Sequence, residues 1–251
     1  MKKLLFIIPF FFLQSIEAQF FQEQRTIDEL EVSVGLLNIQ GDFGIRDRFE
    51  TTLRSIGVNL GGKMYLNLTN PYNSTTYLGT HIQYNVALNL SYSKIAHKGY
   101  EDYPKIDAIT GQNFSVGLGV NIEYHMSDIR NSSFFTNDFL YSFDPYIGGG
   151  IYGYYYHVEL SSSLGDLNDP AVLPSSYVGA ISNGSRFVGA FHIETGIRYK
   201  HSDYVHYVFK SDWMYFMDDK FDGLNPNPEL VKNLHNDWTI LTSLGVIFYL
   251  P

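Results

Sequence analysis

The last stretch of the chain, residues 237–250, alternates between apolar and polar side chains with a period of two. In an extended strand this period sends successive side chains to opposite faces. One face then carries the apolar set Trp238, Ile240, Leu244, Val246, Phe248 and Leu250, and the other carries Asp237, Thr239, Ser243 and Gly245. Such a strand needs an apolar environment on one side only. An open apolar edge in water would template aggregation, and closing the sheet into a barrel removes that edge.

Similar alternation recurs along the chain, with turn-forming stretches in between. We expect strands at about residues 30–39, 56–68, 81–94, 114–124, 145–157, 186–200, 204–217 and 237–250. The composition of 20 Tyr, 19 Phe, 22 Gly and only 17% charged residues is typical of membrane barrels. The sequence therefore predicts an all-β fold, a closed antiparallel up-and-down transmembrane β-barrel with eight strands. Ten strands are the alternative if segments 134–142 and 171–181 also pair.

The N-terminus predicts export. Lys2 and Lys3 precede an apolar run at 4–13, and Ala18 is followed by a plausible cleavage point. We therefore expect a signal peptide at 1–18, an outer-membrane barrel domain at 19–251, and a location in the outer membrane. Removing two lysines and Glu17 from 17 basic and 26 acidic residues leaves 15 and 25, a net charge of −10, which argues against nucleic acid as a partner. With no cysteine, burial and closure must supply the stability.

If the apolar faces contact lipid, the opposite faces line the lumen. Six charged side chains in the middle of strands then point inward: Lys63, Glu123, Glu194, Arg198, Lys210 and Asp212. An eight-stranded barrel has a lumen that side chains fill, and balanced charges inside it can pair. We expect a plug of salt bridges and hydrogen bonds. A narrow pore for small solutes is the alternative function.

Catalytic and metal-binding residues are weakly indicated. His157, Glu159 and Ser161 lie near the predicted outer rim and would suit a lipid-modifying enzyme, but exposed His and Ser are common without relay geometry. Residues 218–229 place acidic side chains at positions 1, 5 and 12 of a calcium loop, whereas Lys220 occupies the third position, so a solvated acidic loop is favoured. We therefore expect no enzyme activity, no metal and no cofactor.

The C-terminal strand resembles the closing-strand signal of bacterial outer-membrane barrels. The matching residues are Ser243, Gly245, Phe248 and Leu250, although the chain ends on Pro251 where the signal usually has an aromatic residue. The resemblance implies that the outer-membrane assembly machinery binds this strand. It also implies that outer-membrane lipid surrounds the folded barrel.

Short motifs along the chain resemble a largely uncharacterised family of small outer-membrane barrels from flavobacteria and other Bacteroidota. They are Gly41-Asp42-Phe43-Gly44, Ile122-Glu123-Tyr124, Asp144-Pro145-Tyr146, Asp222-Gly223-Leu224-Asn225-Pro226 and Asn236-Asp237-Trp238. The chain is also loosely similar to PorG, a barrel of the type IX secretion and gliding apparatus. These resemblances imply a membrane anchor or accessory whose partner is another envelope protein.

Overall fold

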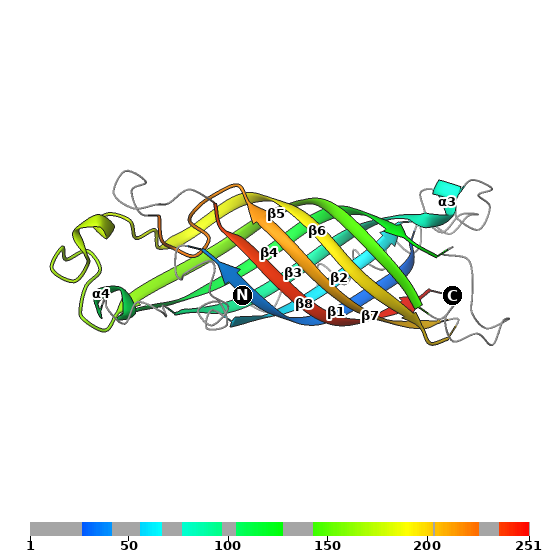
Figure 1. Cartoon of the computed structure of the whole chain (residues 1–251), viewed down its shortest axis with the longest axis horizontal. Helices are drawn as coiled ribbons and strands as arrows, with labels where there is room; N and C mark the ends of the chain where they lie inside the picture. Colours follow the sequence, from blue (N-terminus) through cyan, green and yellow to red (C-terminus); the bar gives the residue numbers. More distant parts are fainter. Residues whose placement is uncertain are drawn as a thin grey trace, which may run out of the picture.

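A computed structural model describes residues 27–41, 56–66, 77–96, 104–127, 143–202, 204–225 and 236–250, without the side chains of residues 77 and 176. Within these ranges eight antiparallel strands close into one barrel in the order in which they occur in the chain (Figure 1). They are β1 (Ile27–Gln40), β2 (Ile56–Leu66), β3 (Ile82–Ala96), β4 (Ile109–His125), β5 (Phe143–Ser162), β6 (Gly184–Lys200), β7 (Val205–Phe216) and β8 (Trp238–Tyr249). The predicted signal peptide, 1–18, lies outside the described residues.

The barrel closes through β8, the strand with which the sequence argument began. β8 pairs with β1 along one edge, with Val32 opposite Val246, and with β7 along the other. The prediction of a closed eight-stranded barrel is therefore confirmed. The ten-strand alternative is wrong for segment 171–181, which holds a short 3-10 helix (Ser175–Tyr177) and one isolated bridge instead of a strand. The other segment, 134–142, lies outside the described residues.

The wall of the barrel is apolar outside and polar inside, as β4 illustrates. Leu118, Val120 and Ile122 project outward and are 61%, 54% and 52% exposed. Asn121 and Glu123 alternate with them and are only 3% and 1% exposed. This arrangement is the reverse of a water-soluble barrel, and it is the one that lipid outside and a polar lumen require.

Two short helices lie at opposite ends of the barrel, α3 (Tyr77–His81) at one and α4 (Pro104–Asp107) at the other (Figure 1). We call these the α3 end and the α4 end. No helix in the described ranges is long and apolar enough to cross a membrane. Strands β4 and β5 extend further towards the α4 end than predicted, because Ile109 still pairs with Ser162 after the apolar alternation has stopped.

Aromatic side chains fill the lumen towards the α4 end. Tyr154 and Tyr156 point inward from β5 and contact Phe221, which comes from the connection that follows β7. The rings of Phe221 and Phe216 stack with centroids 3.9 Å apart. The Asn113 side chain donates a hydrogen bond to the Phe221 carbonyl and holds this connection in the barrel mouth. We call these four rings, together with Tyr152, the aromatic layer.

Candidate functional site: the charged layer of the lumen

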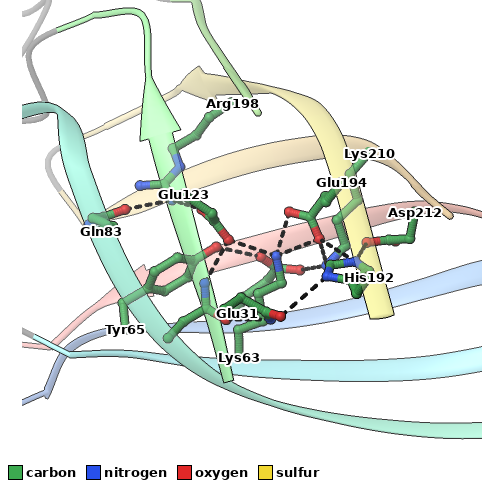
Figure 2. A network of polar contacts seen from close by, with 12 residues as sticks. Glu31, Lys63, Tyr65, Gln83, Glu123, His192, Glu194, Arg198, Lys210 and Asp212 are labelled. Carbon is green, nitrogen blue, oxygen red and sulfur yellow. Dashed lines mark hydrogen bonds and ion pairs between the residues drawn. The ribbon is translucent and has the colours of Figure 1, made fainter. Parts of the chain in front are cut away.

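The six charged residues predicted to face the lumen all do so, and each is at most 5% exposed. They come from β2, β4, β6 and β7 and lie between the aromatic layer and the α3 end. Five of them take part in ion pairs between Lys or Arg and Glu, whereas Asp212 pairs with a histidine. With their partners they form what we call the charged layer (Figure 2).

Lys63 lies at the centre of the charged layer. Its Nζ is 2.8 Å from Oε1 of Glu123 and 2.5 and 2.7 Å from the two carboxylate oxygens of Glu194. Charge-assisted hydrogen bonds of this length are among the strongest that side chains make. Glu123 Oε1 also accepts a hydrogen bond from the side-chain amide of Asn85 at 2.7 Å. The lysine therefore joins carboxylates from two strands, β4 and β6.

Two acidic residues that sequence analysis missed complete the network from β1. Glu29 Oε2 lies 2.8 Å from Arg198 Nη1, and Glu31 Oε1 lies 2.6 Å from Lys210 Nζ. Tyr65 links these pairs, because its hydroxyl donates to Glu31 at 2.8 Å while its ring lies 5.0 Å from the Arg198 guanidinium carbon. The alternation already placed Glu31 on the inward face, but Glu29 lay before the predicted start of the strand.

Glu194 and Asp212 are directly opposite each other on the paired strands β6 and β7. Like charges in that position repel, so the pair needs compensation. His192 Nε2 lies 2.7 Å from Asp212 Oδ1 and 3.8 Å from Glu194 Oε2, and Lys210 also approaches Glu194 at 3.8 Å. The imidazole contacts both carboxylates, and the Lys210 ammonium group adds positive charge beside Glu194, which offsets part of the repulsion.

An alternative interpretation is that His192, Glu194 and Asp212 bind a metal ion. Ligand atoms of His192, Glu194 and Asp212 all lie within 4.8 Å of one another. The oxygens of Glu194, however, already contact the ammonium groups of Lys63 and Lys210. A cation would have to displace both lysines, so we assign these residues to the ion-pair network and not to a metal site.

A second group of polar residues extends the layer towards the α3 end. His125 Nδ1 lies 2.7 Å from Asp144 Oδ2, and its Nε2 lies 3.4 Å from Glu123 Oε2. The other Asp144 oxygen accepts a hydrogen bond from the Ser127 backbone at 3.1 Å. The Arg198 guanidinium group donates a hydrogen bond to Gln83 Oε1 at 3.1 Å. Charged groups therefore occupy the lumen over several successive inward positions.

The other predicted site residues fall outside the charged layer. In β8, Ser243 is buried on the lumen side and Phe248 faces outward with 43% exposure, while Leu250, just after the strand, is 42% exposed. A Cβ atom on Gly245 would lie 2.9 Å from Ser33 Cβ, so this position accepts little more than glycine. In segment 218–229, which only partly matches a calcium loop, Asp222 is buried and accepts a hydrogen bond from the Leu224 backbone at 2.8 Å, and position 229 lies outside the described residues.

A closed barrel with an apolar outer wall and a polar, ion-paired interior is a transmembrane β-barrel. Similar solved structures are Neisserial surface protein A (11% identity, 88% of this chain and 96% of that chain covered, TM-score 0.46), OprG from Pseudomonas aeruginosa (12%, 90% and 98%, 0.44) and the outer membrane enzyme PagL (11%, 88% and 99%, 0.38). At these identities the similarity concerns the fold alone. No protein-family model and no curated protein sequence matches the chain.

Proposed function

We propose that this protein is a non-conducting outer-membrane β-barrel that serves as a membrane anchor or accessory of a larger envelope assembly. The observation that carries the proposal is the contact between Lys63 and Glu194. These residues lie on β2 and β6, which are opposite each other in the ring of eight strands. Side chains therefore meet across the width of the lumen.

Two layers oppose the passage of solutes. The charged layer would have to lose several buried ion pairs before water could form a continuous path, and removing one partner of a buried pair typically costs about 3–5 kcal/mol. The aromatic layer adds an apolar barrier nearer the α4 end, where Phe216 and Phe221 stack. An eight-stranded barrel is just wide enough for such side chains to fill it.

The outer-membrane location is supported by the apolar outward faces and by the exported character of the N-terminal sequence. An even number of strands brings the beginning of β1 and the end of β8 to the same end, the α3 end. In outer-membrane barrels that end faces the periplasm. The α4 end is then extracellular, and of the described residues it carries the segments 104–108, 163–183 and 217–225.

The anchoring role is supported by the surfaces that a closed barrel leaves accessible to a partner. A closed lumen leaves only the outer wall and the connections at the two ends for binding a partner. The sequence resemblance to barrels of the type IX secretion and gliding apparatus supports an envelope protein as that partner. In-cell crosslinking followed by purification from outer membranes should yield a defined complex, and recovery of the barrel alone would contradict the anchoring role.

The closed lumen is tested by single-channel recording on the purified, heat-modifiable protein in planar bilayers. We expect no steady conductance from the wild-type barrel and none from a Val34→Ala control, which changes only the outward face. Steady wild-type conductance that changes in size in Lys210→Ala would overturn the proposal. The function would then be transport of small solutes.

A further inference from the structure

A row of polar side chains crosses the outer wall of the barrel near the α4 end. The Tyr92 hydroxyl donates to Gln112 Oε1 at 3.1 Å, and Gln112 Nε2 donates to Glu159 Oε2 at 3.0 Å. Glu159 Oε1 lies 3.0 Å from His157 Nε2, and His157 Nδ1 lies 2.8 Å from Ser185 Oγ. The row thus runs without a break from β3 to β6, and all its contacts lie on the exposed face.

The last three members of this row have the order of a hydrolytic relay: a hydroxyl, a histidine and a carboxylate. When the imidazole proton is on Nε2, it is donated to Glu159, and the lone pair of Nδ1 accepts the Ser185 hydroxyl proton. That arrangement makes the histidine a general base for a serine nucleophile. Gln112 holds the second oxygen of Glu159 and so fixes the carboxylate that orients the ring.

The register of the strands places the relay at a defined depth. Ser185 and His157 are opposite each other on β6 and β5, and the next outward-facing pair towards the middle of the barrel is Phe187 with Tyr155. These two aromatic side chains are 76% and 49% exposed. Outward aromatic residues mark the boundary between hydrocarbon and headgroups. Lipid ester groups lie in this interfacial zone, and the Phe187–Tyr155 pair therefore indicates that Ser185 is at a similar depth.

A surface groove of about 830 Å³ adjoins the relay. Its walls include His157, Glu159 and Gln112, together with Leu160 and Lys94. The exposed ammonium group of Lys94 offers a cation for a lipid phosphate, as basic side chains near a membrane surface commonly do. The groove therefore brings the base, its carboxylate and a cation together on the outer wall, and it reaches Gly184, the residue before Ser185.

We propose that Ser185, His157 and Glu159 form a hydrolytic site for the acyl esters of outer-leaflet lipids. Ser185 Oγ attacks the ester carbonyl carbon while its proton passes to His157. The bond to the lipid alcohol then breaks, and the alcohol leaves with that proton. Water, deprotonated by His157, next attacks the acyl carbon on Ser185; the bond from that carbon to Oγ breaks, Oγ takes the proton back from His157, and a fatty acid is released. The site lies on the outer wall, so it is independent of whether the lumen conducts.

This proposal departs from the sequence-based expectation that the protein is not an enzyme. Sequence analysis grouped His157 and Glu159 with Ser161, but the Ser161 hydroxyl donates to the Thr110 carbonyl at 3.5 Å. Ser185 takes the nucleophile position because the pairing of β5 with β6 brings it next to His157. Ser163 provides a matched control, because it is an exposed serine just beyond the end of β5 that belongs neither to the relay nor to the lining of the groove.

The proposal is tested with the full-length mature protein in two kinds of vesicle, one of phosphatidylethanolamine and phosphatidylglycerol and one that also contains lipopolysaccharide. Fatty-acid release is followed by mass spectrometry, and an active-site fluorophosphonate is used to label the nucleophile. We expect release from at least one vesicle type and a label on Ser185. Ser185→Ala and His157→Gln should lower release about 10²- to 10⁴-fold. Ser163→Ala should match the wild type.

Glu159 acts through His157 and is a positioning residue. Glu159→Gln should lower kcat, leave KM unchanged and slow the labelling of Ser185. As a folding control, we expect all variants to keep the heat-modifiable electrophoretic mobility of the folded barrel, because the relay residues lie on the exposed wall and not in the packed lumen. Release that is unchanged in Ser185→Ala, or no release and no label with either vesicle type, would overturn the proposal. The vesicle type that supports release identifies the lipid as phospholipid or lipopolysaccharide.

Discussion

Lys63 on β2 reaches Glu194 on β6 across the lumen, with Nζ 2.5 and 2.7 Å from the two carboxylate oxygens. Three strands separate β2 from β6 in either direction around the closed ring. The contact therefore ties opposite walls of the barrel together. Both side chains are almost fully buried, so each depends on the other for its charge to be tolerated.

Replacing Lys63 with methionine should destabilise the barrel by about 3–5 kcal/mol, because Glu123 and Glu194 lose their nearest cation in a site from which water is largely excluded. Urea unfolding in lipid vesicles measures the change. The double variant Lys63→Met/Glu194→Met should recover most of the lost stability, because the β6 carboxylate that faces position 63 is then absent. Additive effects of the two single changes would contradict direct coupling between these residues.

Close contacts between glycine and tyrosine on paired strands should make the aromatic layer sensitive to a single methyl group. Gly119 lies opposite Tyr152, and a Cβ atom there would be 2.5 Å from the tyrosine ring. Gly119→Ala should therefore displace the ring from its hydrogen bond with Asn121 and destabilise the barrel by about 1–3 kcal/mol. Gly62→Ala is the control, because its Cβ atom would meet only a backbone oxygen at 3.5 Å. Equal unfolding midpoints for the two variants would rule out this packing effect.

The strands and their faces were predictable because alternation with a period of two is a local property of the sequence. β8 shows this directly: Leu244 is 63% exposed to the lipid side, whereas Ser243 is 2% exposed. The ion-pair partners were not predictable in the same way. Lys63 and Glu194 are 131 positions apart, and only the register of eight strands and the closure of the ring bring them together.

The polar row on the outer wall shows the same limit. Sequence proximity suggested Ser161 as the companion of His157, yet the strand pairing selects Ser185, 28 positions away. The set of lumen charges predicted from the sequence was also incomplete, because Glu29 precedes the apolar alternation that marked the first strand. β1 begins earlier than the alternation does, since Glu29 pairs across to Tyr65 and Tyr249.

Phe248 should matter more for assembly in the cell than for stability. Its ring faces outward near the end of β8 and is 43% exposed, so Phe248→Ala removes little packing inside the barrel. If the assembly machinery binds this strand, the variant should reach the outer membrane in several-fold lower amounts while refolding normally in detergent. Quantitative blotting of heat-modifiable protein measures the first effect. The same loss in Phe209→Ala, an outward aromatic change on β7, would show that the effect is not specific to the closing strand.

The depth of the apolar band is tested by placing one arginine at two heights on the same outward face of β4. Leu118 is 61% exposed near the middle of the strand, whereas Thr110 lies at its beginning, near the α4 end. Leu118→Arg should lower the free energy of unfolding in vesicles by about 2–4 kcal/mol, and Thr110→Arg by at most about 1 kcal/mol, because the cost of a guanidinium group falls from the bilayer midplane to the interface. Urea titration measures both. If the two variants were equally stable, the outer wall at Leu118 would not be in hydrocarbon, and the membrane would have to lie elsewhere along the barrel.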